Sequence, residues 1–413
     1  MINVALLLAG QVGRRGRPAV GRSLLSSTPS RQIPYSSWIA VRHMSFTEKK
    51  DDNNNENAVG EAPRAPADTE IVATTPTTAD QAQDLIVTST TGIGQVIFLN
   101  SPLSGGILWT GWVLSNPTLA GLGLLGAVTA TATSKHVFKV DNNSWKDGLW
   151  GYNGALVGCA AGVSLLVGPT SSLAVGAAAT MFGAAATPLV QSKLQQHVIT
   201  ASPQWTYAFN FVTLSMLGTS KALTSPSEVG SGGDVAAIDA ATATSSWMDV
   251  LVTTPLVGIS QIFLVESALS GGVIVAGIAT YSPGLAAHAI MGSAIGSTVG
   301  VALWDVPLTD ITNGLWGYNA ALSSMAVGVF WSHSIPTVAL SATSAALTAC
   351  LFGAVTSSHM LGDLPCFTLP FCVTMTLTHI VMRNAPNSGS QGMFPLFADA
   401  PHSPEKNTAK TSD

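Results

Sequence analysis

The chain carries one short stretch twice, and this repetition constrains its fold more than any other feature. Residues 148–158 read GLWGYNGALVG, and residues 314–322, which begin 166 positions later, read GLWGYNAAL. Further pairs with the same offset are Gln95 with Gln261, Phe98 with Leu264, and Ser104-Gly105-Gly106 with Ser270-Gly271-Gly272. A constant offset over such a distance indicates that one structural unit has been duplicated. The sequence therefore predicts two copies of one fold unit.

The composition indicates a chain that is embedded in a membrane. Charged residues make up 9% and hydrophobic residues 47% of the 413 residues, whereas a soluble domain carries about 25% charged residues. The apolar runs between Asp84 and Arg383 are rich in Gly, Ala, Ser and Thr, which permit close helix packing in lipid. We therefore predict an all-α, multi-pass membrane protein with the lipid bilayer as its partner. This composition excludes a soluble binding module, and we expect no nucleic-acid partner.

Six apolar segments are expected in each half of the membrane region. Those of the first half (84–223) lie at about 84–100, 103–115, 117–134, 148–168, 172–190 and 205–223. Those of the second half (249–384) lie at about 249–265, 269–281, 283–304, 314–333, 336–358 and 366–384. Segments 103–115 and 269–281 have only 13 residues, and each is followed by a segment that begins with a proline, Pro117 or Pro283. A spanning helix needs about 20 residues, so these two segments suit re-entrant helices. Each half then has five crossings and one half-crossing.

An odd number of crossings per half requires the second copy to enter the membrane from the opposite side. With the N-terminus inside, the loop 135–147 also falls inside, and it contains three lysines. The polar linker 224–248 falls outside and contains acidic residues but no lysine or arginine. Basic loops mark the inner side, so the charges agree with two inverted repeats, apart from Lys221 near the outer end of its segment. Inverted repeats place the functional site at their interface, near the membrane midplane.

The two ends of the chain have different compositions from the membrane region. Residues 1–47 contain six arginines, many serines and no acidic residue, which is typical of a mitochondrial transit peptide. The alternative, of equal weight, is that translation starts at Met44. Residues 48–83 and 385–413 are polar, and we expect both to be disordered.

The expected spans offer neutral polar side chains in place of charged ones. They include Gln95, Gln261, Asn153, Asn319, Thr206 and Thr368. Glu266 stands where the first half has Asn100, and we favour a helix cap for it over a vestibule residue that attracts polar solutes. The histidines show no H-x-x-x-H or H-E-x-x-H pattern, and the four cysteines lack zinc-ligand spacing. We therefore expect buried thiols, no metal, no cofactor and no enzyme activity.

Three motifs together resemble the urea transporter family. Residues 94–105 (GQVIFLNSPLSG) are similar to the opening motif of each half in that family. Residues 148–154 (GLWGYNG) are similar to its central motif, and residues 363–371 (DLPCFTLPF) to its closing motif. The matches span about residues 84–384. The resemblance implies two inverted halves, each with five helices and a re-entrant segment, assembled as homotrimers with one passive urea pore per subunit.

The resemblance also implies which residues line the pore. Paired glutamines and threonines supply polar contacts, and aromatic or leucine side chains form the walls of a narrow slot. The implied positions are Gln95, Gln261, Thr206, Thr368, Phe98 and Leu264, with the helical pairs Tyr152/Leu156 and Tyr318/Leu322 as weaker matches. Pro370 is expected to free a backbone carbonyl beside Thr368, which would give urea a second acceptor.

Several positions depart from the family pattern and leave alternatives open. In the first-half counterpart of the closing motif, Thr206 follows the bulky Trp205, and Ala208 replaces the proline. These departures leave open a channel for ammonia, short amides or water. An ion-coupled secondary transporter built on the same inverted repeat is a separate alternative. We expect the plasma membrane as the location, or the mitochondrial inner membrane if residues 1–43 are a transit peptide.

Overall fold

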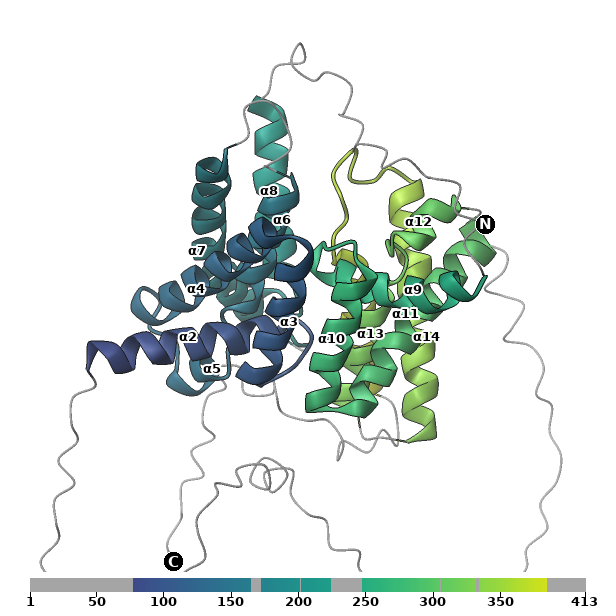
Figure 1. The fold of residues 1–413 in the computed structure, drawn as a ribbon, viewed down its shortest axis with the longest axis horizontal. Coiled ribbons are helices and arrows are strands. Elements are labelled where there is room, and N and C mark those ends of the chain that lie inside the picture. The colour runs from purple at the N-terminus through teal and green to yellow at the C-terminus, as the bar shows by residue number, and fades with distance from the viewer. Residues whose placement is uncertain are drawn as a thin grey trace, which may run out of the picture. The chain divides into compact units, whose positions relative to one another are not determined.

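The computed structural model describes residues 77–164, 172–200, 202–223, 247–304, 306–331 and 334–384. All of them belong to one compact unit, Ala73–Asp413. The expectations for the transit peptide, for the tail 385–413 and for nearly all of the linker 224–248 lie outside the described residues. Within the described residues every regular element is a helix (Figure 1).

The helices follow each other in the same order in the two halves. The first half contains α2 (Thr78–Gln95), α3 (Pro102–Ser115), α4 (Pro117–His136), α5 (Asn142–Lys146), α6 (Tyr152–Ser164), α7 (Leu173–His197) and α8 (Tyr207–Leu223). The second contains α9 (Trp247–Ser260), the 3-10 turn η1 (Gln261–Phe263), α10 (Ala268–Tyr281), α11 (Pro283–Trp304), α12 (Leu308–Thr312), α13 (Tyr318–Phe330), α14 (Ile335–Ser357) and α15 (Leu369–Asn384). Each expected apolar segment overlaps an α-helix, with ends that shift by up to seven residues, and the short helices α5 and α12 were not among the expected segments.

Proline and side-chain caps explain why α3 and α10 are short. Ser101 and Ser267 cap the two helices at equivalent positions by accepting a hydrogen bond from the backbone N–H three residues later, at 3.2 Å in both. Pro117 and Pro283 begin the following helices, where the fixed proline φ suits a first turn. α9 and α10 are bent by 79° at the break between them. The two short segments are therefore separate helices, as the sequence predicted.

The hydropathy of the helices fits an integral membrane protein. Three of the described helices, α7, α11 and α14, are long and apolar enough to cross a membrane, or up to four if the bent α9–α10 pair is counted as one span. Large apolar side chains are exposed on these helices, such as Phe182 at 76% and Ile335 at 87%. Such apolar surface is unusual on a water-facing protein and suits contact with lipid.

Helix α2 begins earlier than the sequence suggested. It starts at Thr78, so residues 78–83, which were expected to belong to a disordered tail, are helical. Thr77 and Asp80 form a capping box, in which each side chain bonds the backbone of the other. Hydrogen bonds donated to the Asp80 carboxylate by the Thr77 hydroxyl, which is the larger cause, and by the Thr77 backbone N–H lower the pKa of the Asp80 carboxyl from its usual value. The cap stabilises an exposed first turn that apolar periodicity does not mark.

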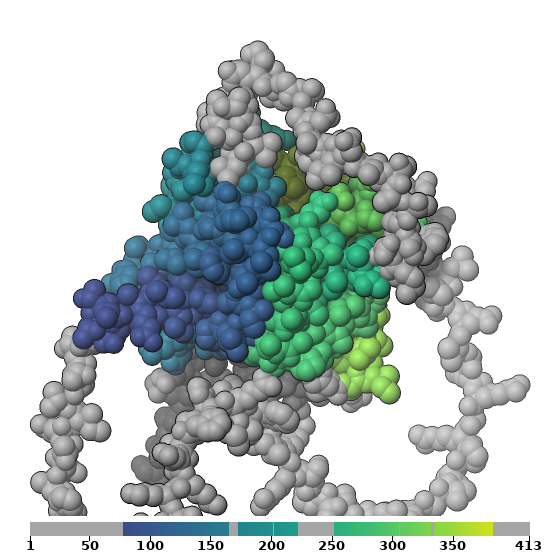
Figure 2. Space-filling view, viewed as in Figure 1, coloured from purple at the N-terminus to yellow at the C-terminus, as the bar shows by residue number. Residues whose placement is uncertain are grey.

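Helices α3 and α10 pack against each other in opposite directions. Ser104 at the start of α3 lies 3.4 Å from the hydroxyl of Thr280 at the end of α10. Ser270 at the start of α10 lies 2.6 Å from the hydroxyl of Ser115 at the end of α3. Gly111 permits this approach, because a Cβ there would lie 3.3 Å from the Ser270 carbonyl oxygen. In Figure 2 the blue surface of the first half meets the green surface of the second.

Candidate functional site

Two threonines from opposite halves meet inside the protein. The hydroxyl oxygens of Thr206 and Thr368 are 2.7 Å apart, and each residue is only 3% exposed. Each directly precedes a helix, α8 or α15, and each follows a residue with positive φ, Trp205 at 46° or Phe367 at 42°. Residues with side chains rarely adopt this conformation, and such outliers gather at functional sites. The structure thus brings together the two threonines that the sequence paired.

Asn210 completes this polar cluster and was not among the predicted site residues. Its amide nitrogen donates to the Thr368 hydroxyl at 2.8 Å and to the Thr206 carbonyl at 2.8 Å. Its amide oxygen accepts from the Thr368 N–H at 3.2 Å. At the matching place on α15, Cys372 lies with its sulfur 3.2 Å from the Thr206 hydroxyl. The sequence signal for Asn210 is an amide side chain one helical turn after Thr206. Its counterpart in the second half is the thiol of Cys372, so comparison of the two repeats does not single out this position.

The carbonyl expected beside Thr368 is not free. The Thr368 carbonyl accepts from the N–H of Cys372 at 3.0 Å. Pro370 cannot donate to the Cys366 carbonyl four residues earlier, and that oxygen accepts from the Leu369 N–H at 3.0 Å instead. The expectation of a second, proline-freed acceptor is therefore wrong, because the first turn of α15 satisfies these oxygens. The hydroxyl of Thr368 is the acceptor that remains to be considered.

The two predicted tyrosines support the segments that carry the threonines. The Tyr152 hydroxyl donates to the Trp205 carbonyl at 2.6 Å, and the Tyr318 hydroxyl donates to the Phe367 carbonyl at 2.6 Å. Both bonds are buried. Each tyrosine therefore holds the positive-φ residue that precedes a threonine.

The following asparagines hold the starts of α8 and α15 in the same way. Asn153 accepts from the Phe209 N–H at 3.1 Å, and Asn319 accepts from the Phe371 N–H at 3.3 Å. Asn319 also donates to the Phe367 carbonyl at 2.9 Å. The Tyr-Asn pair of each central motif is thus a structural clamp on the closing segment of its own half.

The two glutamines occupy equivalent places near the bends before α3 and α10. Gln95 donates its amide N–H to the Asp147 carbonyl, and Gln261 donates to the Asn313 carbonyl, both at 2.7 Å. Among the described residues no hydrogen bond engages the side-chain oxygen of either glutamine. The bonds of each glutamine within the described residues are thus made by its amide nitrogen, and neither glutamine bonds to the threonine pair.

Phe98 and Leu264 share an unusual backbone conformation. Their φ angles are 67° and 60°, which only a few per cent of non-glycine residues adopt. Phe98 is buried, and its ring lies 6.3 Å from the Trp205 ring and 6.3 Å from the Phe371 ring, measured between centroids. Leu264 is partly buried and packs against the same apolar cluster. Both predicted slot residues thus lie at equivalent bends, each three residues after its glutamine.

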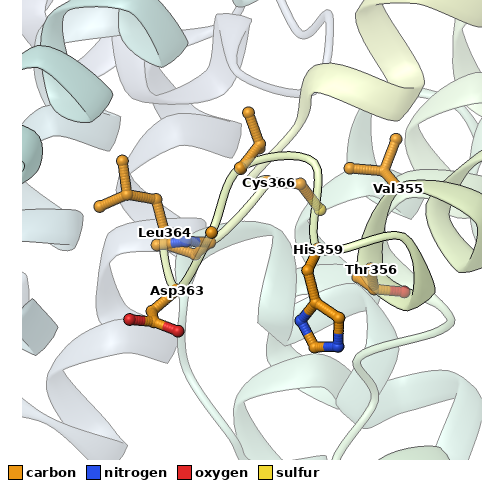
Figure 3. Close-up of a pocket in the computed structure, with 9 residues that line it drawn as sticks. Val355, Thr356, His359, Asp363, Leu364 and Cys366 are labelled. Atoms are coloured by element: carbon orange, nitrogen blue, oxygen red, sulfur yellow. The ribbon is translucent and has the colours of Figure 1, made fainter.

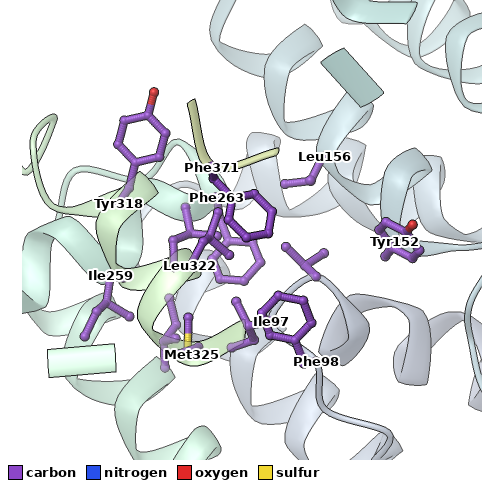
Figure 4. Close-up of a cluster of buried hydrophobic side chains, with 14 of the residues drawn as sticks. Ile97, Phe98, Tyr152, Leu156, Ile259, Phe263, Tyr318, Leu322, Met325 and Phe371 are labelled. Atoms are coloured by element: carbon purple, nitrogen blue, oxygen red, sulfur yellow. The ribbon is translucent and has the colours of Figure 1, made fainter. Parts of the chain in front are cut away.

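The buried apolar cluster includes Trp205 and Phe367, which directly precede the two threonines. Leu156 and Leu322 are 1% and 0% exposed and belong to the same cluster as Phe98. Figure 4 shows Leu322, Phe263 and Phe371 converging near the middle of the cluster, with Tyr318 and Tyr152 on opposite sides of it.

The aromatic rings in this cluster make matching contacts between the halves. The Trp205 and Phe371 rings lie 5.5 Å apart, and the equivalent rings of Phe367 and Phe209 lie 5.2 Å apart. The bulky Trp205 thus occupies the place that Phe367 occupies in the second half.

Glu266 does not cap α10. The capping side chain is that of Ser267, which accepts from the Ser270 N–H. The Glu266 carboxylate faces Asn313, whose amide nitrogen donates to it at 3.0 Å when the amide is oriented toward its acceptors. The helix-cap interpretation is therefore wrong, because the next residue has the hydroxyl in the correct position.

A pocket of about 290 Å³ lies beside the closing segment of the second half (Figure 3). Its lining comes from the end of α14 and from the loop before α15, and it includes Val355, Thr356, His359, Asp363, Leu364 and Cys366. Cys366 directly precedes Phe367, so the pocket reaches to within two residues of Thr368 along the chain.

Comparison with known proteins shows the family. Residues 86–383 match the model of the family described as "Urea transporter". The chain belongs to the urea transporter family. It is 29% identical to urea transporter 1 of Mus musculus over 309 residues, which cover 72% of this chain and 77% of that protein. It is 30% identical to urea transporter 1 of Rattus norvegicus over 308 residues, with the same coverage of both chains.

Membership of the urea transporter family confirms the function predicted from the sequence. The chain is an integral membrane protein that transports urea, and it is not an enzyme. The matched region contains every predicted site residue, from Gln95 to Thr368.

Proposed function

We propose that this chain is a passive urea channel whose path runs between two inverted halves and narrows at the Thr206–Thr368 pair. The contact between these two hydroxyls carries the proposal. It joins the closing segments of both halves at one buried point, where an inverted repeat places its site.

Reciprocal contacts support the inversion of the halves. The start of α3 meets the end of α10, and the start of α10 meets the end of α3. Around the threonines, Asn210 of α8 bonds to Thr368, while Cys372 of α15 bonds to Thr206. Exchanging the halves leaves each of these contacts in place, which is the property of a two-fold axis. Two units related by such an axis between antiparallel helices enter a membrane from opposite sides.

The side chains around the threonine pair fit the shape and chemistry of urea. Urea is small, planar and neutral, with four N–H donors and one carbonyl. A narrow slot for it needs apolar faces and acceptors that replace its water along one edge. Phe98, Leu264, Leu156 and Leu322 supply the apolar faces, and Thr206, Thr368, Gln95 and Gln261 supply hydroxyl or amide oxygens. Tyr152 and Tyr318 hold the backbone that presents the threonines. We propose that the pocket at Cys366 is a vestibule to this path.

Among the described residues, no carboxylate or amine bonds to the threonine pair, where coupling of urea to an ion would need one. Across the described ranges the ion pair is Lys221 with Asp363, and both side chains are more than half exposed. The polar groups around the threonine pair are neutral amides, hydroxyls and a thiol. Pumps and coupled transporters use ionisable residues within their spans. Urea should therefore move along its own gradient.

The oligomeric state and the host membrane are part of the same proposal. We propose that the chain forms a homotrimer in the lipid bilayer, with one urea path in each subunit. The plasma membrane is the proposed location, and the mitochondrial inner membrane follows instead if residues 1–43 are a transit peptide. Fluorescent tagging of the chain with and without residues 1–43 separates the two.

Stopped-flow light scattering on proteoliposomes tests the function. Vesicles containing the protein should admit urea faster than empty vesicles, with a rate that is proportional to the urea gradient and indifferent to membrane potential. Water, ammonia and formamide measured in parallel define the selectivity. Accumulation of urea against its gradient, driven by protons or sodium, would overturn the passive mechanism.

A further inference from the structure

Each half contains one amide–carboxylate pair at the bend that follows its glutamine. In the first half the Asn100 amide nitrogen donates to the Asp147 carboxylate at 3.0 Å. In the second half the Asn313 amide nitrogen, oriented toward its acceptors, donates to the Glu266 carboxylate at 3.0 Å. Asn100 and Glu266 are equivalent positions 166 residues apart, and so are Asp147 and Asn313. The carboxylate is therefore the second residue of the pair in the first half (Asp147) and the first residue in the second half (Glu266), and the hydrogen bond is present in both.

The same two positions also hold the glutamines. The backbone carbonyl of Asp147 accepts from Gln95, and the backbone carbonyl of Asn313 accepts from Gln261, at 2.7 Å in both halves. Residue 147 or 313 thus binds the glutamine with its main chain and the bend with its side chain. The bend contains the positive-φ residue Phe98 or Leu264. Each pair connects the loop before the central motif to both proposed pore residues of its half.

The exchange shows which property of the pair matters. A hydrogen bond from an amide to a carboxylate is charge-assisted and stronger than one between neutral groups. It forms whichever partner carries the charge, and it fails when both partners are carboxylates. The two halves retain one amide and one carboxylate, and they do not retain the residue types.

We infer that the Asn100–Asp147 and Glu266–Asn313 pairs are positioning residues for urea permeation, each fixing the glutamine and the slot residue of its half. The inference rests on the proposed pore. It states that each pair supports permeation when one of its two residues is a carboxylate, whichever residue that is, and fails when both are carboxylates.

Exchange variants in the first half test this rule. Asn100→Asp places two carboxylates face to face, and urea flux should fall roughly fivefold or more at pH 8, because the charge-assisted bond is replaced by repulsion. Asn100→Asp combined with Asp147→Asn restores one amide and one carboxylate in exchanged positions. This double variant should return the flux to within about twofold of the parent. Asn142→Asp, which adds an exposed carboxylate at the start of α5, is the matched control and should leave the flux unchanged.

The pH dependence separates positioning from general damage. In the Asn100→Asp single variant, one proton between the two carboxylates restores a hydrogen bond, so urea flux should recover as the pH falls from 8 to 5. The double variant and the parent should lack this recovery. The titratable side chains on α2, on α4, on α5 and in the loop before α5 are Asp80, Asp84, Lys135, His136, Lys139, Asp141 and Lys146. None of them bonds to Asn100 or Asp147 within the described residues; Lys135 lies over the Trp145 ring, 3.6 Å from its centroid.

Three outcomes overturn the inference. These are a single variant that conducts like the parent at pH 8, a double variant that stays impaired, and an impaired single variant without acid recovery. If the single variant cannot be incorporated into vesicles, the amount of incorporated protein replaces urea flux as the readout. The double variant must then restore this amount to that of the parent. The equivalent changes in the second half are Asn313→Asp alone and with Glu266→Gln, and they must show the same loss and rescue. A parent protein that conducts no urea would contradict the proposed function, whereas a conducting parent with unaffected variants would contradict only the pairing rule.

Discussion

Asn210 and Cys372 occupy matching positions on α8 and α15, and each bonds to the threonine of the other helix. The Asn210 amide nitrogen donates to the Thr368 hydroxyl at 2.8 Å. The Thr206 hydroxyl lies 2.7 Å from the Thr368 hydroxyl and 3.2 Å from the Cys372 sulfur. The four side chains therefore form one hydrogen-bonded cluster in which the two threonines are not equivalent. Thr368 is held by an amide, whereas Thr206 contacts a thiol, which is a weak hydrogen-bonding group.

This asymmetry predicts unequal effects of removing the two hydroxyls. Thr368→Val keeps the side-chain shape but removes both the acceptor for a urea N–H and the partner of Asn210. The lost hydrogen bond should raise the barrier by roughly 0.5–1.5 kcal/mol, which lowers urea flux several-fold. Thr206→Val should lower it less. Stopped-flow flux at equal protein density measures both, and Thr343→Val, at an exposed threonine of α14, is the control. Parent-like flux in Thr368→Val would remove the threonine from the proposed filter.

Local sequence signals predicted the elements, and contacts between distant segments could not be read from them. Pro117 and Pro283 marked the breaks after the two short helices, because proline acts on the adjacent backbone. The pairing of Gln95 with Gln261 followed from the repeat. Neither signal shows that the Thr206 and Thr368 hydroxyls touch across 162 residues. Asn210 was missed for the same reason, since its role comes from a partner on another helix.

The start of α2 and the role of Glu266 show the limits of local signals in another way. The capping box at Thr77 extends the helix into a segment whose polar composition suggested disorder. Glu266 stands before a helix, where an acidic residue often caps, but Ser267 took that role and left the carboxylate to Asn313. Where two neighbouring residues could cap, the sequence does not decide between them.

The inverted arrangement predicts the sides of the membrane on which two loops lie. The loop 135–147, with its three lysines, and the linker 224–248, with none, should be on opposite faces. Asn142→Cys and Ser231→Cys, each in a background without reactive cysteines, can be labelled from outside with an impermeant thiol reagent. Only the linker position should react in intact cells. Labelling of both positions from the same side would contradict the inverted repeat.

The size difference between Trp205 and Phe367 predicts a change in selectivity. Trp205 fills its half of the aromatic cluster and contacts Phe330 at 5.3 Å and Phe371 at 5.5 Å between ring centroids. Trp205→Phe gives both halves the same ring and removes volume next to Thr206. Methylurea flux should rise relative to urea flux by roughly fivefold or more, since a missing group in an apolar pocket is worth about 1 kcal/mol or more. Phe367→Trp is the reciprocal control and should lower both fluxes. An unchanged ratio in Trp205→Phe would place the ring outside the path.

The two tyrosines predict unequal stability losses, because their carbonyl partners are satisfied differently. The Phe367 carbonyl accepts from the Tyr318 hydroxyl and also from the Asn319 amide at 2.9 Å. Within the described residues the Trp205 carbonyl accepts from the Tyr152 hydroxyl alone. Tyr152→Phe thus leaves a buried carbonyl unsatisfied, which costs roughly 1–3 kcal/mol. Tyr318→Phe leaves the Asn319 bond in place and should cost about 0.5–1.5 kcal/mol.

Thermal unfolding of the two variants in detergent, followed by circular dichroism, measures this difference. Tyr152→Phe should show the larger fall in midpoint temperature, and because the Trp205 segment carries Thr206, its urea flux should also fall. Tyr318→Phe is the matched control, since it removes the same hydroxyl from the equivalent position of the other half. Equal midpoints for the two variants would show that another group satisfies the Trp205 carbonyl. A larger loss in Tyr318→Phe would mean that the Asn319 bond does not hold the Phe367 segment by itself.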